Sequence, residues 1–212
     1  MSLAFDRILQ ELFATSPSPL EQPSAVALAS YLELLLRWSR RVNLTGFRDP
    51  LAAAEGLLYD GAELAPLLPR DAVLLDIGSG AGGLAFCLAH LRDDIFFHLV
   101  EPRTKRAVFL RTATRELKLS DRVEVIEARA ESLPQERAAS IDVAMAQAVF
   151  PPEQWLPLGS TLVRPGGTVV CLTAKPLDRC AGPSANLEIV LQRDYRLPRS
   201  GAARVITLLE KG

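Results

Sequence analysis

Short apolar runs typical of strands alternate with longer helical runs from Val73 to the end of the chain. The first strand-type run, 73–77, leads into a glycine-rich segment, and a helical pattern then continues to Leu91. Strand-type runs and helical runs keep alternating after that, with strands expected at 95–101, 122–128, 141–149 and 168–174 and helices at 104–119 and 152–163. Parallel strands need such crossover helices, so the pattern predicts an α/β fold with a doubly wound, mostly parallel sheet.

The two ends of the chain depart from this alternation. The last strand-type runs, 187–195 and 203–211, have no long helix between them, which predicts an antiparallel C-terminal hairpin. Residues 1–70 carry apolar side chains at helical spacing, interrupted by a loop at 15–23. We therefore expect an N-terminal helical cap over 1–70 and a second domain over 71–212.

The charge balance limits the partners of such a fold. The chain has 24 basic and 25 acidic side chains, so no overall field would hold nucleic acid or an anionic membrane. Any polyanion must meet a local patch, and two groups of arginines are candidates for phosphate contacts: Arg37, Arg40, Arg41 and Arg48 near the N-terminus, and Arg193, Arg196, Arg199 and Arg204 near the C-terminus.

Several classes of protein are not expected from the sequence. No apolar run is long enough to span a membrane, and the first residues lack the basic start and cleavage site of a signal peptide. The 3 cysteines and 2 histidines have no metal-ligand spacing and form no disulfide framework. We expect a cytoplasmic protein without a metal.

The glycine-rich segment is the first sign of a ligand site. Gly78, Gly80 and Gly83 fit the pattern G-x-G-x-x-G after a strand, which is typical of a turn that approaches a nucleotide cofactor. Asp76 precedes the first glycine by two residues, and a carboxylate there would repel a pyrophosphate. It suits a cationic cofactor instead, such as S-adenosylmethionine, although the segment alone could also be a tight turn with a capping aspartate.

Two further segments fit an adenosine cofactor. Glu101 ends the next expected strand, where a carboxylate can accept hydrogen bonds from both ribose hydroxyls. Residues 128–131 end the following strand, where a backbone amide and a carboxylate can recognise adenine, although such a segment is often only a surface loop. NAD shares the ribose contact, so the choice between these cofactors depends on Asp76, which counts against a nicotinamide-dependent oxidoreductase.

Five short segments in order resemble the bacterial family of 16S ribosomal RNA guanine methyltransferases that make 7-methylguanosine, known as RsmG or glucose-inhibited division protein B. They are WSRRVNLT at 38–45, LDIGSGAG at 75–82, VEPRTKRAVFL at 100–110, ARAE at 128–131 and YRLPRSGAAR at 195–204. The resemblance implies a Rossmann-like class I methyltransferase fold that uses S-adenosylmethionine. It also implies a monomer whose partner is 16S ribosomal RNA or the small ribosomal subunit.

The resemblance also implies a role for individual residues. The cofactor-binding residues would be Asp76, Gly78, Gly80, Gly83, Glu101, Ala130, Glu131 and Gln147. The catalytic group would be Arg129, Lys175 and Arg204, and the RNA would contact Lys105 and Arg199. Three of these basic residues have a simpler alternative, because Lys105 could be a solvated helix residue, Lys175 a loop lysine and Arg204 a strand-edge side chain.

The chain also departs from the family pattern. The glycine turn continues as Gly83, Leu84 and Ala85 instead of an apolar residue and Pro-Gly. Asp60 is kept from a family segment whose histidine is absent, and Gln147 stands where the family has an arginine. These departures leave open a diverged, noncatalytic cofactor-binding or ribosome-associated protein, and they predict low activity if the chain is an enzyme.

Overall fold

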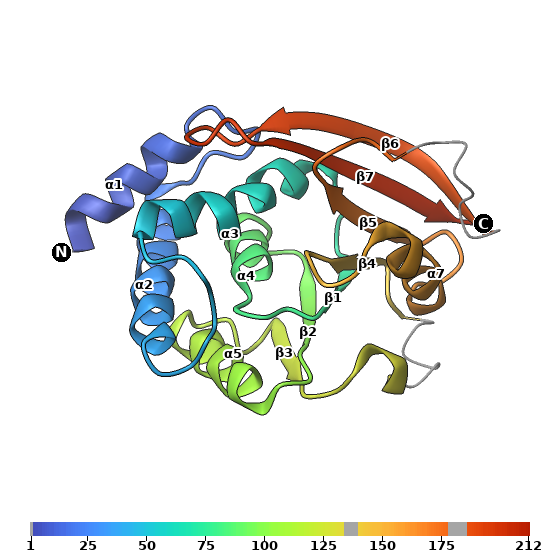
Figure 1. Ribbon diagram of the computed structural model, residues 1–212, viewed down its shortest axis with the longest axis horizontal. Coiled ribbons are helices and arrows are strands. Elements are labelled where there is room, and N and C mark those ends of the chain that lie inside the picture. Colours follow the sequence, from blue (N-terminus) through green and yellow to red (C-terminus); the bar gives the residue numbers. More distant parts are fainter. Residues whose placement is uncertain (1, 134–139, 178–185) are drawn as a thin grey trace.

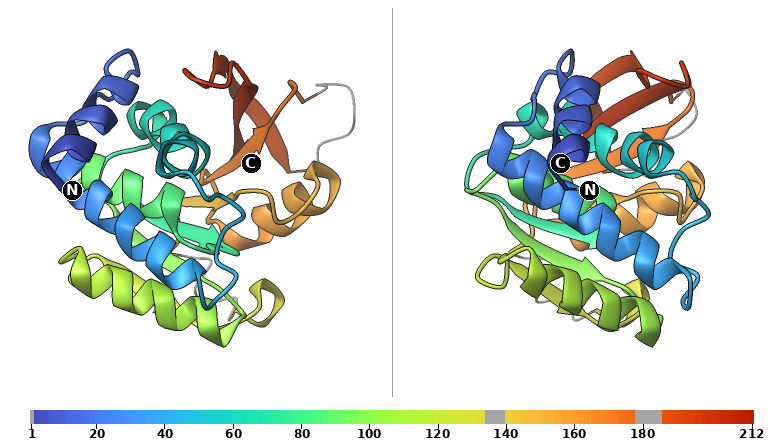
Figure 2. Two further views of the ribbon diagram at one scale, coloured as in Figure 1. Left: turned by 60° about the vertical axis from the view of Figure 1, so that its left-hand side comes forward. Right: turned by 90° about the vertical axis from the view of Figure 1, so that its left-hand side faces the viewer.

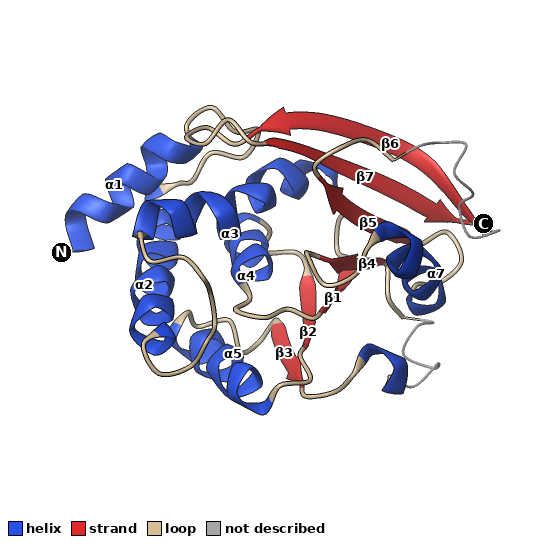
Figure 3. Cartoon of the chain, in the orientation of Figure 1, coloured by secondary structure: helices blue, strands red, loops and turns tan. Residues whose placement is uncertain are grey.

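The computed structural model describes residues 2–133, 140–177 and 186–212. Its centre is a 7-stranded sheet with the strand order β3-β2-β1-β4-β5-β7-β6, shown in Figures 1 and 3. The strands are β1 (Val73–Ile77), β2 (Phe96–Val100), β3 (Val123–Ile126), β4 (Val143–Ala146), β5 (Thr168–Thr173), β6 (Leu187–Arg196) and β7 (Ala203–Lys211). Strands β1 to β5 pair in parallel, whereas β7 runs antiparallel to both β5 and β6. The predicted doubly wound sheet and antiparallel hairpin are confirmed.

Helices cover both faces of the sheet, as the crossover rule requires. The crossover helices are α4 (Gly83–Leu91), α5 (Thr104–Glu116) and α7 (Pro152–Leu162), with short 3-10 turns η1 (Ala65–Leu67) and η2 (Ala130–Ser132). Alternate residues of β4 enter different cores: Val143 and Met145 join the core beneath α4 and α5, whereas Ala144 and Ala146 join the core beneath α7. Burial on both faces explains why the sequence of β4, VAMA, is apolar throughout rather than alternating.

Three helices make up the N-terminal cap: α1 (Ser2–Phe13), α2 (Gln22–Ser39) and α3 (Pro50–Leu64). Pro50 begins α3, and the Asp49 carboxylate accepts a hydrogen bond of 2.8 Å from the backbone amide of Ala52, which is a standard N-terminal cap. Figure 2 shows these helices against one side of the sheet. Their apolar side chains, such as Leu28 and Leu58, belong to the same core as the sheet residues. The division at residue 70 stays a prediction.

The β6–β7 hairpin is attached to α3 by buried acids. The Glu55 carboxylate accepts hydrogen bonds from the backbone amides of Arg199 and Ser200, and the Glu63 carboxylate lies 3.2 Å from the Arg193 guanidinium. In Figure 1 the hairpin accordingly arches over the end of α3. These contacts join the two parts of the chain that line the pocket described below.

Two expected elements end earlier than predicted. The strand expected over 141–149 ends at Ala146, because Ala148 adopts a positive φ of 55° that leaves the strand conformation. The helix expected over 104–119 ends at Glu116, and Lys118 has a φ of 57°. Both residues take the left-handed conformation without being glycine, so the local sequence does not reveal the two ends.

Within the described ranges, no helix is both long and apolar enough to cross a membrane, and no group of histidine, cysteine and acidic side chains could hold a metal ion. Cys87 and Cys171 are buried free thiols, and Cys180 lies outside the described residues.

Candidate active site

The glycine turn joins β1 to α4 and is held by hydrogen bonds to the neighbouring strand. The backbone amides of Gly78 and Ser79 donate to the Val100 carbonyl oxygen over 2.8 Å and 3.1 Å. Gly78 and Gly80 have positive φ angles of 69° and 60°, which glycine adopts without steric cost. The turn therefore presents bare backbone to the space above β1.

Gly82 is a third residue of the turn that must be glycine, and the sequence analysis missed it. Its φ is 77°, and a Cβ atom there would lie 2.6 Å from the Phe86 ring and 2.7 Å from the Leu110 side chain. Gly83, which fits the sequence pattern, serves a different purpose, since a Cβ atom would lie 2.7 Å from Cβ of Leu57. It lets α4 and α3 approach closely. Because Gly82 and Gly83 are adjacent, the sequence alone does not show which of them adopts the left-handed conformation.

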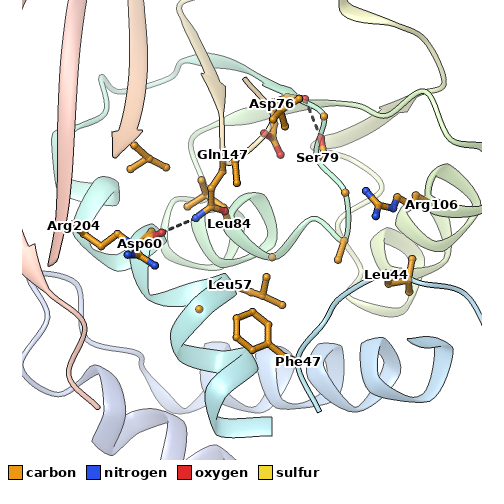
Figure 4. A pocket seen from close by; sticks show the side chains of 18 of the residues that line it. Leu44, Phe47, Leu57, Asp60, Asp76, Ser79, Leu84, Arg106, Gln147 and Arg204 are labelled. Carbon is orange, nitrogen blue, oxygen red and sulfur yellow. Dashed lines mark hydrogen bonds and ion pairs between the residues drawn. The ribbon is translucent and has the colours of Figure 1, made fainter. Parts of the chain in front are cut away.

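A pocket of about 460 Å³ lies beside this turn, at the carboxyl ends of β1 and β4 (Figure 4). Ligands of open α/β sheets bind at this edge of the sheet. The pocket combines two buried carboxylates, two guanidinium groups, bare backbone and an apolar wall. The side chains that give it this character are Asp60, Asp76, Arg106, Gln147, Arg204, Leu44, Phe47, Leu57 and Leu84.

Asp76 is a buried acid of the pocket whose pKa is strongly raised. Its side chain is only 4% exposed. Burial raises the pKa of Asp76 to about 7, a hydrogen bond with Ser79 opposes this rise, and the charge of Glu101 adds to it. Figure 4 shows Asp76 and Ser79 on the glycine-turn side of the pocket. A carboxylate with this pKa is stabilised when a cation enters beside it.

Glu101 supports the glycine turn from behind. It is 3% exposed, and its two carboxylate oxygens accept hydrogen bonds from the backbone amides of Gly80 at 3.0 Å and Arg103 at 2.9 Å. Its side chain is not among those that line the pocket. A carboxylate has about four acceptor positions, so Glu101 retains capacity for further donors.

Asp60 gathers polar groups from three distant segments at the other end of the pocket. Its carboxylate accepts hydrogen bonds from Gln147 Nε2 and Tyr195 Oη, each at 2.6 Å, and lies 3.9 Å from Arg204 Nε. Burial raises the pKa of Asp60, whereas Tyr195, Arg204 and Gln147 lower it. Burial and the nearby Asp60 carboxylate also raise the pKa of Tyr195. This cluster places Gln147 and Arg204, two of the predicted site residues, on one carboxylate.

The other predicted residues lie outside the pocket lining. Arg129 and Glu131 are exposed and Ala130 is buried where η2 begins, beyond the end of β3. Lys175 is exposed and follows Ala174, a residue of the pocket lining. The roles of these four residues stay predictions.

Two basic residues predicted to contact RNA are also exposed. Lys105 is exposed on α5, and the next residue, Arg106, lines the pocket instead, with its Nη2 donating to the Asn43 carbonyl oxygen at 3.3 Å. Arg199 lies at the tip of the hairpin, 3.4 Å from the Asp49 carboxylate. The sequence does not show which face of α5 meets the glycine turn, so helical spacing alone could not predict that residue 106, and not residue 105, lines the pocket.

Comparison with known proteins decides the family. The family model described as GidB, rRNA small subunit methyltransferase G, matches residues 25–199. The chain belongs to this family. It is 33% identical over 211 residues to the ribosomal RNA small subunit methyltransferase G of Anaeromyxobacter dehalogenans strain 2CP-C, covering 97% of each chain. It is 34% identical to the protein of the same name from Dichelobacter nodosus, covering 99% of this chain and 97% of that one. The resemblance seen in the sequence is confirmed.

Solved structures share the fold at lower identity. A SAM-dependent methyltransferase from Aquifex aeolicus superimposes with a TM-score of 0.58 at 16% identity, over 77% of this chain and 94% of that one. The [4+2]-cyclase SpnF gives 0.59 at 17% identity, over 87% and 93%. These likenesses confirm the Rossmann-like methyltransferase fold. Because a cyclase shares it, the fold does not fix the reaction.

Proposed function

We propose that this protein transfers a methyl group from S-adenosylmethionine to N7 of a guanine in 16S ribosomal RNA. Membership of the rRNA small subunit methyltransferase G family supports the reaction class, as do full-length relatives of that name. The single observation that carries the proposal is the buried Asp76 carboxylate beside a bare glycine turn. It selects against a pyrophosphate cofactor and for a cationic one.

The pocket residues fit S-adenosylmethionine. Its α-ammonium group would lie against Asp76, where a cation relieves the cost of a buried carboxylate. The backbone at Gly78 and Gly80 would admit the cofactor closely, and Glu101 would accept hydrogen bonds from the ribose. Ala130 and Glu131 are proposed to contact adenine. The Asp76 carboxylate would repel the pyrophosphate of NAD, so it favours S-adenosylmethionine over NAD. Within the described residues, no group of side chains could hold a metal ion.

The chemistry asks little of the protein beyond positioning. S-adenosylmethionine supplies a methyl group activated by a sulfonium. Guanine N7 carries an in-plane lone pair and no proton, so the site needs no general base. The apolar wall of Leu44, Phe47 and Leu57 would exclude water, and Arg204 would donate a hydrogen bond to guanine O6. Lys175 and Arg129 are proposed to complete the cationic surroundings of the base.

The substrate must present its guanine in an open structure. The major groove of A-form RNA is too deep and narrow for a protein to reach N7, so the target would lie in a loop or junction. We propose that the partner is 16S ribosomal RNA or the small ribosomal subunit, and that the protein acts as a cytoplasmic monomer.

Transfer of labelled methyl groups tests the proposal. The purified protein should transfer tritium from S-adenosylmethionine to small subunits or 16S RNA from cells that lack the gene, and digestion should release the label as 7-methylguanosine. Label in another nucleoside would contradict the guanine assignment. Tight cofactor binding with no transfer to either substrate would favour the noncatalytic alternative, which the comparisons do not favour.

A further inference from the structure

The structure separates the two groups of arginines that were candidates for phosphate contacts. Three of the hairpin arginines face acids of the α3 region: Arg193 lies 3.2 Å from Glu63, Arg199 3.4 Å from Asp49, and Arg204 3.9 Å from Asp60. Arg196 donates to the Gly201 carbonyl oxygen. Three of the hairpin arginines therefore each face an acidic partner, whereas Arg196 has a carbonyl oxygen as its partner.

The arginines at and after the end of α2 differ from the hairpin arginines in their contacts. Arg37, Arg40, Arg41 and Arg48 are exposed, and their side chains make no hydrogen bond or ion pair with any residue that the structure describes. Arg37, Arg40 and Arg41 surround a groove of about 430 Å³ whose other lining residues are Trp38 and Val42. We call these five residues the α2 groove. It joins unpaired positive charge to a half-buried aromatic ring, the combination with which proteins hold single-stranded nucleic acid.

The segment that follows the α2 groove along the chain reaches the pocket. The segment that follows α2 contributes Leu44 and Phe47 to the pocket lining, and Arg106 lines the same pocket while donating to the Asn43 carbonyl oxygen. The helices α2 and α5 are in contact, as Figure 1 shows. A strand held in the α2 groove would therefore lie beside the segment that forms one wall of the pocket.

We propose that the α2 groove binds a single-stranded segment of the substrate RNA, with its phosphates on Arg37, Arg40 and Arg41 and a base against Trp38. This inference rests on the proposed function and adds the side from which the RNA enters. A structural alternative is that the arginines only favour the helix C-terminus by interacting with its dipole. That alternative predicts an effect on stability and none on RNA binding.

Matched charge removal distinguishes these possibilities. Arg40→Gln/Arg41→Gln removes two charges from the groove. The control, Arg7→Gln/Arg70→Gln, removes two exposed charges from α1 and from the segment before β1, so both double variants alter net charge equally. Binding of in vitro transcribed 16S RNA should weaken by about tenfold in the groove variant, and the slope of log affinity against log salt should fall by about 1.5. The control variant should change neither quantity by more than about twofold, and Arg40→Lys/Arg41→Lys should restore the slope.

Tryptophan fluorescence reports the contact directly. The chain has 2 tryptophans, and Trp155, which belongs to α7, is 1% exposed in the core on the other face of the sheet. In the Trp155→Phe protein the emission comes from Trp38 alone, and added RNA should quench it. If the groove variant binds RNA as tightly as the parent protein, or if Trp38 emission does not respond to bound RNA, the proposal is overturned.

The same proteins keep this inference separate from the proposed function. Cofactor binding, measured by calorimetry without RNA, should be the same in the parent and both double variants. A parent protein that binds RNA through the groove but forms no 7-methylguanosine would contradict the proposed reaction and support the groove. If the parent protein forms 7-methylguanosine and the groove variant binds RNA as tightly as the parent, the proposed reaction would be supported and the proposed groove contradicted.

Discussion

Replacing Asp76 with asparagine tests the charge logic of the cofactor site. Asparagine keeps the size of the side chain and removes its negative charge. Affinity for S-adenosylmethionine should fall by about 1.5–3 kcal/mol, the usual cost of losing a hydrogen bond to a charged group. S-adenosylhomocysteine keeps the ammonium without the sulfonium, so a similar loss for both ligands would assign the effect to the ammonium.

The pH dependence follows from the raised pKa of Asp76. With a pKa of about 7 in the free protein, about 9% of the carboxyl is ionised at pH 6.0 and about 76% at pH 7.5. If only the ionised form binds the cation, affinity should rise about eightfold between these pH values. At pH 6.0, binding should also release about 0.9 protons, which calorimetry in buffers of different ionisation enthalpy measures.

The same shift has a consequence for stability. The folded pKa lies above the ordinary value of 3.8, so the folded state binds more protons than the unfolded state between these values. The contribution of Asp76 to the free energy of unfolding is thus fully present below pH 3.8 and is lost as pH rises through about 7. The ligand-free Asp76→Asn protein should be more stable than the parent at pH 7.5.

Glu63 provides the control. Its pKa is also raised by burial, yet it pairs with Arg193 and does not line the pocket. Glu63→Gln should therefore keep the pH dependence of cofactor binding that Asp76→Asn loses. An eightfold rise that survives in Asp76→Asn, or cofactor affinity indifferent to this change, would refute the reasoning.

Other predictions concern the turn, the second carboxylate and the substrate. Gly82→Ala should lower the free energy of unfolding, measured by thermal unfolding, by about 2 kcal/mol or more, because the new Cβ atom would have an unfavourable φ and would also clash with neighbouring side chains. Gly201→Ala has a similar φ of 67° but open space around it, so it should cost only about 1 kcal/mol. Gln147→Arg should raise the initial rate of methyl transfer by the equivalent of up to about 1.5–3 kcal/mol, because the new guanidinium can make a charge-assisted hydrogen bond to the cofactor carboxylate or the guanine. Arg129→Ala should leave this gain unchanged, and a slower Gln147→Arg enzyme would contradict it. Binding of 16S RNA should weaken as salt rises, and salt-independent binding would exclude phosphate contacts.

What the sequence predicted well is local in the chain. The alternation of strands and helices, the glycine turn and Asp76 depend on residues within a few positions of one another, and the sheet brings these to its carboxyl edge by a general rule. The sequence could not show which of Gly82 and Gly83 is left-handed, because either glycine can adopt that conformation; the φ of 77° at Gly82 shows it, and Gly83 lines the pocket.

The Asp60 cluster could not be predicted from spacing. Its members Asp60 and Tyr195 are 135 residues apart, and their contact depends on how β7 inserts between β5 and β6 and carries the hairpin over α3. In the family pattern Gln147 stands in place of a positive charge, whereas the structure shows its side-chain amide donating to Asp60. Pairings between distant segments of this kind follow from topology rather than from local pattern.

Nucleoside mass spectrometry of 16S RNA tests the central claim most directly. RNA from a strain that lacks this gene should contain less 7-methylguanosine than RNA from its parent, and the gene supplied in trans should restore it. The Asp76→Asn gene should restore less than the unaltered gene at equal protein level. Equal amounts of 7-methylguanosine in the parent and the deletion strain would contradict the account.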